Sequence, residues 1–571
     1  MCASQKRWRT IDLPAQAAES LRDELKIHPA LCGILAHRGI DDYQKAKFFF
    51  RPDLTTLHDP FLMKDMQLAV ERIIDAIAQE EKILVYGDYD VDGTTSVAIM
   101  YDFLTKIYDK DQLEFYIPNR YREGYGLSSQ GIAYAAEKGF SLLITLDCGI
   151  KSVALIAEAK AMGIDTIVCD HHLPGAELPP AIAILNAKQQ DCPYPYKELC
   201  GCGVGFKLIQ ALGKNRNQTI EDLTEYLDLV ATAIAADIVP MTGENRVLAY
   251  FGLQVINTNP RPGIKALTYQ IKKQVLDITD VVFIIAPRIN AAGRIKHGNH
   301  AVELLSEFDF EQAQQFALEI EKNNTDRKEL DKQITIEALS QIEQNNEIEG
   351  FTTVVYQENW HKGVIGIVAS RLMETYYRPT LVFTKSGDKL AASARSVKGF
   401  DVYNALEACA EHLEQFGGHM YAAGLTLKEE NYVAFKQAFE KVVSETIDPE
   451  LLLPEISIDL EIDFPQITPK FLRIINQFEP FGPLNMTPIF MSKNIYDTGF
   501  PKLMGADQSH LKLFVKQNNS EGIAAIGFGM GNKLNLVANK KPFDAAYCID
   551  ENEWNGTVSI QLRLRDIKNN E

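Results

Sequence analysis

A short apolar strand that runs directly into three aspartates is the feature that most constrains this chain. Ile83–Tyr86 are four apolar or aromatic residues followed by a glycine, and they predict a buried strand because no helical periodicity crosses them. Asp88, Asp90 and Asp92 follow at alternate positions, and a helix is expected over about 95–108. Close carboxylates repel one another. The cluster is therefore either a solvated turn or a site for multivalent cations.

The alternation of strand and helix continues to about residue 188. Helices of this length between strands predict a parallel sheet with crossover helices, which is an α/β fold. A further helix, buried toward its C-terminal end, is expected over 221–236. The expected strands are 82–86, 113–117, 141–146, 164–169 and 181–185.

Further acidic and imidazole side chains follow two of these strands and one helix. In an open parallel sheet, ligands gather at the carboxyl ends of the strands, near the point where strand order reverses. A mixture of carboxylate and imidazole without thiolate suits Mg²⁺ or Mn²⁺, and the histidines favour Mn²⁺. Taken singly, each aspartate could cap a helix and each histidine could be a core residue, but their convergence favours a metal site. The residues are Asp147, Asp170, His171, His172 and Asp237.

The remaining chain divides into segments of different character. Residues 348–450 repeat an α/β pattern in which a Gly-Gly turn is expected at 417–418. Short alternating segments after Pro454 predict a small β-barrel or sandwich. The predicted domains are 1–75, a helical cap on the first large domain; 76–300, the first α/β domain; 301–347, a helical connector; 348–450, the second α/β domain; and 451–571, the β-rich domain.

Composition limits the cellular setting and the partners. The net charge of −19 disfavours nucleic acid as a partner, but residues 261–300 hold seven basic against two acidic residues, so an anionic ligand remains permitted. No apolar run is long enough to span a membrane, and the N-terminus lacks a secretory signal. Nine cysteines, several in expected core strands, indicate free thiols in a reducing cytoplasm. Cys200-Gly-Cys202 has no matching pair for zinc and is interpreted as structural.

Several motifs resemble those of the DHH phosphoesterase superfamily. The segments 87–93 (Gly-Asp-Tyr-Asp-Val-Asp-Gly), 147–149 (Asp-Cys-Gly) and 170–172 (Asp-His-His) match its successive motifs. From about residue 75 onward the chain is similar to one branch, the RecJ family of bacterial single-strand-specific 5′→3′ DNA exonucleases. The motifs that narrow the resemblance are 117–127, 287–294, 360–371, 417–424 and 478–483.

The resemblance implies two divalent cations, Mn²⁺ or Mg²⁺, that share Asp147. It also implies that His172 donates to the phosphate and that Asp170 orients the histidines, although a structural role for His172 stays open. The pyrophosphatase branch has a histidine ligand where this chain has Tyr86, so the first metal site should be poorer in nitrogen. The implied ligands are Asp90 and Asp147 with Asp88 nearby for one ion, and Asp92, Asp147, His171 and Asp237 for the other.

The resemblance also indicates residues that hold the 5′-terminal phosphate or the phosphates next to it. Arginine suits this role because its planar fork grips phosphate with two bonds, although each arginine could instead form a salt bridge. Tyr121 and Tyr125 could stack on bases or pack in the core. The phosphate candidates are Arg120, Arg294, Ser393, Arg395, Gly417, Gly418 and His419.

These features predict an exonuclease that releases 5′-mononucleotides from single-stranded DNA by two-metal hydrolysis, in recombination and repair. Specificity for single strands would follow from a cleft between the two α/β domains too narrow for a duplex, and the β-rich tail resembles an OB-fold, a common single-strand platform. A monomer is expected, with a helicase and a single-strand-binding protein as possible partners. The alternatives are a hydrolase of small nucleotides or short oligonucleotides, which generally lacks such a tail, and a non-catalytic scaffold, which would have lost metal ligands.

Overall fold

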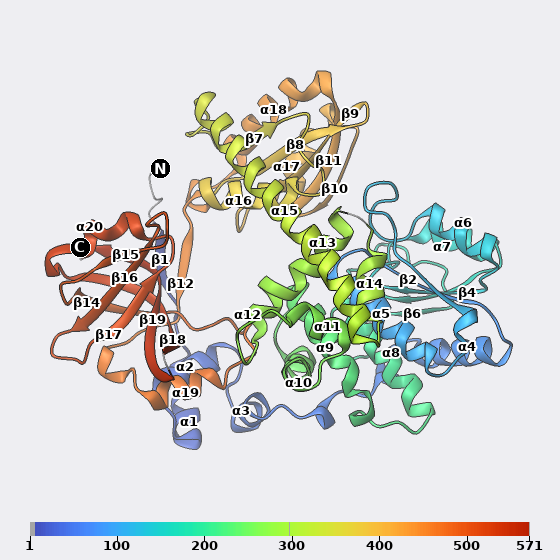
Figure 1. The fold of residues 1–571 in the computed structure, drawn as a ribbon, viewed down its shortest axis with the longest axis horizontal. Helices are drawn as coiled ribbons and strands as arrows, with labels where there is room; N and C mark the ends of the chain where they lie inside the picture. The colour runs from blue at the N-terminus through green and yellow to red at the C-terminus, as the bar shows by residue number, and fades with distance from the viewer. Residues whose placement is uncertain (1–5, 296, 555, 570–571) are drawn as a thin grey trace. The chain divides into compact units, whose positions relative to one another are not determined.

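The computed structural model describes residues 6–295, 297–554 and 556–569. The chain forms two compact units (Figure 1). One unit comprises Glu321–Ile456 with the N-terminal residues up to Trp8, and the other comprises Arg9–Ile320 and Ser457–Glu571. The domain boundaries expected from the sequence remain a prediction.

The larger unit contains the predicted parallel sheet, which confirms the α/β assignment. Its strands have near-continuous apolar sequences, which are typical of strands covered on both faces. All neighbouring strands run parallel. The spatial order is β3 (Leu113–Tyr116), β2 (Ile83–Gly87), β4 (Leu142–Leu146), β5 (Asp165–Cys169) and β6 (Ala183–Leu185).

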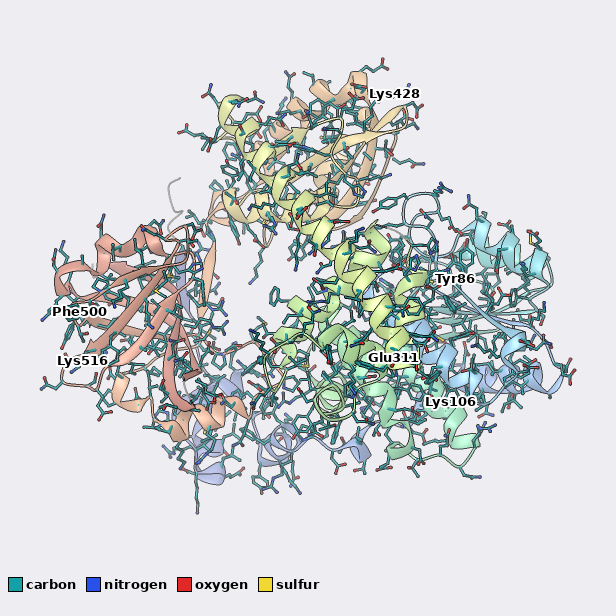
Figure 2. All side chains as sticks on the ribbon, in the orientation of Figure 1. Tyr86, Lys106, Glu311, Lys428, Phe500 and Lys516 are labelled. Atoms are coloured by element: carbon teal, nitrogen blue, oxygen red, sulfur yellow. The ribbon has the colours of Figure 1, made fainter. Side chains whose placement is uncertain are left out.

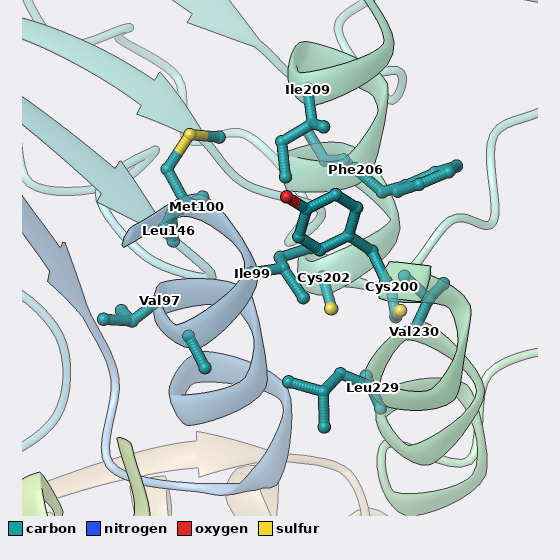
Figure 3. Packing of buried hydrophobic residues seen from close by; sticks show 14 of the residues in the cluster. Val97, Ile99, Met100, Leu146, Cys200, Cys202, Phe206, Ile209, Leu229 and Val230 are labelled. Carbon is teal, nitrogen blue, oxygen red and sulfur yellow. The ribbon is translucent and has the colours of Figure 1, made fainter. Parts of the chain in front are cut away.

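Helices cover both faces of this sheet, so β2 is buried on each side. Ile83 and Val85 belong to the larger apolar cluster, whereas Leu84 and Tyr86 belong to the smaller one. Figure 3 shows part of the larger cluster, where side chains of α5, α8 and α9 meet. The helices of the larger cluster include α4 (Met66–Ala78), α5 (Val91–Thr105), α8 (Gly201–Asn215) and α9 (Leu227–Ala236), and those of the smaller are α6 (Ser129–Lys138) and α7 (Val153–Ala161).

Helix α5 begins at Val91, four residues before the predicted start. Its N-cap is Asp90, whose side chain accepts a hydrogen bond from Gly93 N at 3.0 Å, so the aspartate run itself starts the helix. Asp92 therefore lies in the first helical turn. An added Cβ at Gly93 would lie 2.4 Å from Asp88 O, so this tight strand-to-helix turn requires glycine.

Further helices complete the larger unit's α/β part and lead into the other unit. The predicted connector contains one long helix, α15, of 35 residues. The helices are α10 (Gly243–Thr258), α11 (Pro262–Thr268), α12 (Ile278–Asp280), α13 (Ala286–Ile295), α14 (Asn299–Leu305) and α15 (Phe310–Gln344).

The smaller unit has a mixed five-stranded sheet. The predicted turn at Gly417–Gly418 is wrong, because both glycines lie in strand β10, which pairs with β11. Gly418 has φ of +147° and an added Cβ would lie 2.4 Å from Ala422 O, so its glycine serves close strand contact and not a turn. The order is β10 (Gln415–His419), β11 (Ala422–Lys428), β9 (Lys389–Arg395), β8 (Thr380–Ser386) and β7 (Thr353–Tyr356), with α16 (Ile365–Tyr376), α17 (Val402–Glu407) and α18 (Tyr432–Thr446).

The β-rich tail forms a barrel, as predicted. β14 pairs with both β18 and β16, and this second pairing closes a five-stranded ring of β14, β18, β19, β17 and β16, as in an OB-fold. The short strand β15 and the helix α19 were not predicted. The elements are β13 (Leu460–Glu461), α19 (Pro469–Asn476), β14 (Phe490–Asp497), β15 (Lys502–Met504), β16 (His510–Gln517), β17 (Ile523–Gly527), β18 (Phe543–Trp554) and β19 (Thr557–Asn569).

The N-terminal helices pack with the barrel. Apolar side chains of α1 (Ala15–Leu25), α2 (Pro29–His37) and α3 (Tyr43–Phe50) share one core with barrel residues such as Phe478. The predicted cap on the first large domain is therefore wrong for these three helices, whereas α4 does pack on the parallel sheet. Ahead of them, β1 (Arg7–Thr10) pairs with β12 (Glu455–Ile458).

Two sequence expectations can be compared with the described residues. None of their helices combines the length and apolarity needed to cross a bilayer. The eight cysteines within the described ranges are all buried and free of disulfides, and Cys2 lies outside those ranges.

Candidate metal centre

Three predicted acids lie at one edge of the parallel sheet. Asp88 follows β2, Asp147 follows β4 and Asp170 follows β5. β2 is first in the chain among these strands but lies between β3 and β4, so strand order reverses beside it. Asp88 and Asp147 therefore flank the point where α/β sheets bind ligands.

The structure brings the predicted metal ligands together. The Nε2 atom of His171 lies 3.2 Å from Asp147 Oδ1, 3.5 Å from Asp237 Oδ2 and 3.8 Å from Asp92 Oδ2. Within the described residues, three groups have possible ligand atoms within 4.8 Å of one another: Asp88, Asp90 and Asp147; Asp92, His171 and Asp237; and Asp147, His171 and His172. The first group holds Asp90 and Asp147 with Asp88, and the second holds three of the four residues implied for the other ion, without Asp147. The assignment of these residues as ligands stays a prediction.

The donor set suits a divalent cation. Asp88 Oδ2, Asp147 Oδ1 and His171 Nε2 are buried and have no hydrogen-bond partner. Leaving such atoms unpaired costs about 1–3 kcal/mol each, and a cation would remove that cost. Several carboxylates with one imidazole fit Mg²⁺ or Mn²⁺. The group around Asp88 contains only oxygen donors, in keeping with the prediction made from Tyr86.

Burial, followed by repulsion between neighbouring carboxylates, raises the pKa values of four acids in the centre. Burial and the charge of Asp90 raise the pKa of Asp92 to about 7. Burial and the charge of Asp92 raise the pKa of Asp237 to about 8. Burial also raises the pKa of Asp88 and of Asp147 well above the usual range. Ionised carboxylates at these positions therefore require a compensating positive charge.

His171 and His172 have different environments. Burial, followed by the nearby His172 charge, lowers the pKa of His171 to about 3, so its ring is neutral, as a metal ligand requires. His172 is bound on both ring nitrogens: Nδ1 lies 2.7 Å from Asp170 Oδ1 and Nε2 lies 3.1 Å from the Tyr125 hydroxyl. These contacts favour His171 over His172 as a ligand.

Asp170 forms hydrogen bonds with both histidines. Burial alone would raise its pKa, but the hydrogen bond from His172 and that ring's charge lower it to about 2. Its carboxylate also accepts backbone N–H groups of Ile150, His171 and His172. Burial lowers the pKa of His172, but the bond to Asp170 outweighs burial and raises it.

A contact that the sequence reasoning missed fixes Asp92. Its carboxylate accepts the N–H groups of Gly201 and Cys202, each at 2.7 Å, at the N-terminus of α8, where negative charge is favoured. An added Cβ at Gly201 would lie 2.6 Å from Asp147 Cβ, so only glycine fits. The glycines at the start of α8 were the sequence signal that could have indicated this close contact.

Two residues at or beside the centre have a positive φ, and one of them is strained. Asp147 has φ of 59° and Ile238, beside Asp237, has φ of 58°. Asparagine and aspartate tolerate this region, but a β-branched residue there is a clear outlier. Such strain persists only where the surroundings enforce it, and it is concentrated at functional sites.

Two predicted phosphate-binding arginines lie beside the aspartate loop. Arg120 lies over the Tyr89 ring, with Cζ 4.4 Å from the centroid. An added Cβ at Gly293 would lie 2.9 Å from Tyr89 O, so α13 packs closely on the same loop and brings Arg294 to it. The Tyr121 hydroxyl donates to Arg294 O at 2.5 Å, which gives Tyr121 a packing role.

Tyr125 has a different environment from Tyr121. Its side chain is 53% exposed, and its hydroxyl donates to Asp147 O at 3.2 Å while meeting His172. Sequence reasoning gave Tyr125 only a stacking or packing role, so its link to His172 was missed.

The other predicted phosphate contacts lie together on the smaller unit. Gly417 of β10, Gly424 of β11 and Ser393 of β9 form one row across the sheet. The guanidinium of Arg395 donates to Ser393 Oγ at 3.0 Å. Gly418 and His419 continue β10, which is exposed over both residues. His419 and Arg395 belong to a second row on the same face of the sheet as Gly417 and Ser393.

Comparisons with known proteins agree with this geometry. Three family profiles match: "DHH family, N-terminal domain" over residues 82–234, "DHHA1 domain" over 349–445 and "RecJ OB domain" over 458–566. The single-stranded-DNA-specific exonuclease RecJ of Bacillus subtilis is 38% identical, with 99% of this chain and 71% of the relative covered. The Escherichia coli protein of the same name is 33% identical, with 98% and 97% covered.

Solved structures of RecJ proteins are also similar to this chain. RecJ from Thermus thermophilus in complex with Mn²⁺ has a TM-score of 0.85 and 28% identity, covering 99% of this chain and 80% of that one. Its complex with Mg²⁺ has a TM-score of 0.78 and 26% identity, covering 99% and 79%. Acidic clusters in this chain and metal-bound relatives together support divalent metal binding.

Proposed function

The chain belongs to the RecJ family of DHH phosphoesterases, and from this premise we propose that it is a single-stranded-DNA-specific exonuclease. It hydrolyses phosphodiester bonds from the 5′ end and releases 5′-mononucleotides. The observation that carries the proposal is the convergence of buried, unpaired acids and His171 at the switch point of the sheet. Relatives named as such exonucleases align over nearly the whole chain.

We propose that the centre holds two divalent cations, Mn²⁺ or Mg²⁺. When bound, such a pair activates water and neutralises charge that develops on phosphate oxygens. The proposed ligands are Asp88, Asp90 and Asp147 for one ion, and Asp92, Asp147, His171 and Asp237 for the other.

His172 is proposed to act on the phosphate as a hydrogen-bond donor. Its raised pKa favours the protonated ring, and a protonated imidazole beside a developing negative charge stabilises the transition state. Asp170 fixes the ring orientation through Nδ1. The Tyr125 hydroxyl contacts Nε2 and holds the ring in this orientation until a bound phosphate takes up that N–H.

Separate groups are proposed to hold the strand itself. Arg120 and Arg294 supply bidentate donors beside the centre. Ser393, Arg395 and His419, with the exposed backbone at Gly417 and Gly418, supply the contacts of the smaller unit to the 5′-terminal phosphates.

The outer face of the barrel provides a candidate platform for the single strand. Along β16, Lys512, Phe514 and Lys516 point outward while the residues between them are buried, and Lys502 of β15 pairs with Lys512. Phe500 is 81% exposed and Phe514 48% exposed, and Figure 2 shows Phe500 and Lys516 on this part of the surface. Basic side chains interleaved with exposed aromatic rings are typical of single-strand binding.

The finer biological assignments are also proposals. We place the protein in the reducing cytoplasm as a monomer that acts in recombination and repair. Single-stranded DNA with a 5′ end is its substrate, and a helicase and a single-strand-binding protein are its candidate partners.

A hydrolase of small nucleotides or short oligonucleotides is the second candidate, because the metal centre alone suits either. The barrel face favours the polymer. The test is time-resolved product analysis with an end-labelled single strand, a blunt duplex, a cyclic dinucleotide and pyrophosphate, each with Mn²⁺ and with Mg²⁺. Mononucleotides released from the 5′ end of the single strand alone support the proposal, whereas faster turnover of a small substrate or equal digestion of duplex refutes it.

A further inference from the structure

A short loop connects the metal centre to the barrel. This linking loop, residues 237–242, begins at Asp237, where α9 ends, and leads into α10. The Asp237 N–H still donates to Ala233 O of α9. Four residues later, the Met241 N–H donates to Pro483 O at 2.8 Å, so the loop is tied to the segment that precedes the barrel strands.

That segment, residues 478–486, is here named the latch, and Arg246 fixes it in place. Arg246 is 3% exposed, and its NH1 donates to Phe478 O at 2.7 Å and Pro480 O at 3.3 Å. Asn485 Nδ2 donates to the same two carbonyl oxygens at 2.8 and 2.9 Å. Phe478 is fully buried in the barrel core. The latch therefore joins α10 and the barrel as one packed body.

The linking loop is clamped between α10 and the latch. Pro240 O accepts hydrogen bonds from Asn245 Nδ2 at 3.0 Å and from the Tyr196 hydroxyl at 3.3 Å. On the other side, an added Cβ at Gly482 would lie 3.0 Å from Met241 Cβ and 3.1 Å from its Cε. The latch thus approaches the loop closely through a glycine.

The backbone of the linking loop is strained at the residue next to Asp237. Ile238 has φ of 58° although its side chain is 68% exposed, so no burial of that side chain compensates for the strain. A β-branched residue in this region persists only where its surroundings enforce it. Release of the clamp would let Ile238 return to negative φ and would turn Asp237 away from His171.

We propose that the latch positions Asp237 for metal binding, so that the barrel is a structural part of the metal centre as well as a binding platform. This inference rests on the proposed role of Asp237 as a metal ligand. Gly482, Met241 and Arg246 are positioning residues, and none of them contacts the ion. Mutation of a group that orients a metal ligand typically lowers metal affinity by about 10–100-fold.

The test is a titration of the metal-free full-length protein with Mn²⁺, followed by electron paramagnetic resonance of the free ion. The methyl group added in Gly482→Ala would contact Met241 directly. This variant is expected to raise the Mn²⁺ Kd by about tenfold. The affected ion should be the one whose binding is also weakened in Asp237→Ala. Saturating Mn²⁺ is expected to restore hydrolysis in Gly482→Ala, because only ion occupancy is impaired.

The matched control is Gly527→Ala in β17. Its added Cβ would lie 2.7 Å from Met530 Sδ and 3.1 Å from Met530 Cβ, so it crowds a methionine inside the barrel at least as strongly but is remote in sequence from the linking loop and the latch. Its Mn²⁺ Kd should stay within about twofold of the parent value, well below the change expected for an altered ligand support. An equal rise in both variants would overturn the proposal, because general loss of barrel packing would then explain it.

A second background tests the strain itself. Glycine takes φ near 58° without penalty, so in Ile238→Gly the loop no longer depends on the clamp, and Gly482→Ala should then raise Kd by less than about twofold. The positioning role of the latch is refuted if Gly482→Ala raises Kd as much in the Ile238→Gly background as in the parent chain. It is also refuted if Gly482→Ala leaves Kd unchanged in the parent chain. Neither result would refute Asp237 as a ligand. If Asp237→Ala leaves every Mn²⁺ Kd unchanged, the ligand assignment fails together with the positioning.

Discussion

Nε2 of His171 lies 3.2 Å from Oδ1 of Asp147, and neither atom has a hydrogen-bond partner. The two residues follow different strands, β5 and β4, which lie side by side. With its ring proton on Nδ1, the neutral imidazole offers a lone pair from Nε2 beside the buried carboxylate oxygen, and a shared positive ion would make this proximity favourable. Loss of either proposed ligand should therefore weaken ion binding more than it weakens the fold.

Replacement of Asp147 tests its place in both proposed ligand sets. Asp147→Asn keeps the shape and tolerates φ of 59°, because asparagine is among the residues that enter this region. Turnover on single-stranded DNA should fall at least about a hundredfold, because charge stabilisation of several kcal/mol is lost, while the thermal unfolding midpoint stays near the parent value. The control is Asp102→Asn, which alters a buried carboxyl of α5, and it should retain most activity. A variant Asp147→Asn that kept a tenth or more of the turnover, on the order of 1.4 kcal/mol or less, would exclude the bridging role.

Metal stabilisation should grow with pH. In the metal-free protein the pKa of Asp92 is about 7 and that of Asp237 is about 8, both above the value of about 3.9 expected when unfolded. The native state therefore holds more protons than the unfolded state between these limits, and the stability of the metal-free protein falls as pH rises through this window. Metal binding needs the ionised acids, so the stabilisation by Mn²⁺ rises over the same window.

The measurement is the shift in unfolding midpoint between chelator and excess Mn²⁺, taken at pH about 5.5 and about 8.5, which bracket the two raised pKa values. The shift should be clearly larger at the higher pH. Asp237→Asn, which removes one titrating group, should reduce the difference. Equal shifts at both pH values in the parent chain would contradict the assignment of these acids as ligands.

Removal of the Tyr125 hydroxyl tests the orientation of His172. Tyr125→Phe keeps the ring but loses the contact of 3.1 Å to Nε2. One hydrogen bond contributes about 0.5–1.5 kcal/mol, so kcat should fall by about two- to twelvefold with KM for single-stranded DNA little changed. Tyr134→Phe on α6, which loses a hydroxyl contact to Glu114, is the matched control. A rise in KM with unchanged kcat would instead assign Tyr125 to strand binding.

The barrel face is tested by Phe514→Ala. Base stacking on an aromatic ring is worth about 1–3 kcal/mol, so the Kd for a single strand should rise by about 5- to 150-fold, with the metal-dependent rate on saturating substrate retained. Fluorescence anisotropy with a labelled oligonucleotide provides the measurement. Phe283→Ala removes a phenylalanine that is 74% exposed but lies outside the barrel, and it should leave Kd unchanged. Equal affinities for Phe514→Ala and the parent would move the platform elsewhere.

The sequence predicted the parts of the centre that depend on local order. Asp88, Asp147 and Asp170 each follow an apolar strand, and parallel strands place their carboxyl ends on one edge, so their meeting could be foreseen. The start of α5 was misplaced because Asp90 caps the helix, and a capping aspartate and a metal-binding aspartate look alike in sequence. The contact of Asp92 with Gly201 and Cys202 spans more than a hundred residues and has no local signature.

Other misses also have physical reasons. Two adjacent glycines favour turns, yet Gly418 serves the close contact with β11. Apolar periodicity marks a buried helix face but does not identify the core that buries it. Helices α1 to α3 were therefore assigned to the wrong partner, although their existence was foreseen.

The shared core of α1, α2 and α3 with the barrel has a consequence for synthesis of the protein. These helices precede their partner strands, from Phe490 to Asn569, by more than four hundred residues. At about 5–20 residues per second, the apolar faces of the first helices wait at least about twenty seconds for their partner. Shielding by a chaperone during that interval should matter more for this chain than for a protein whose domains close in the order in which they are translated.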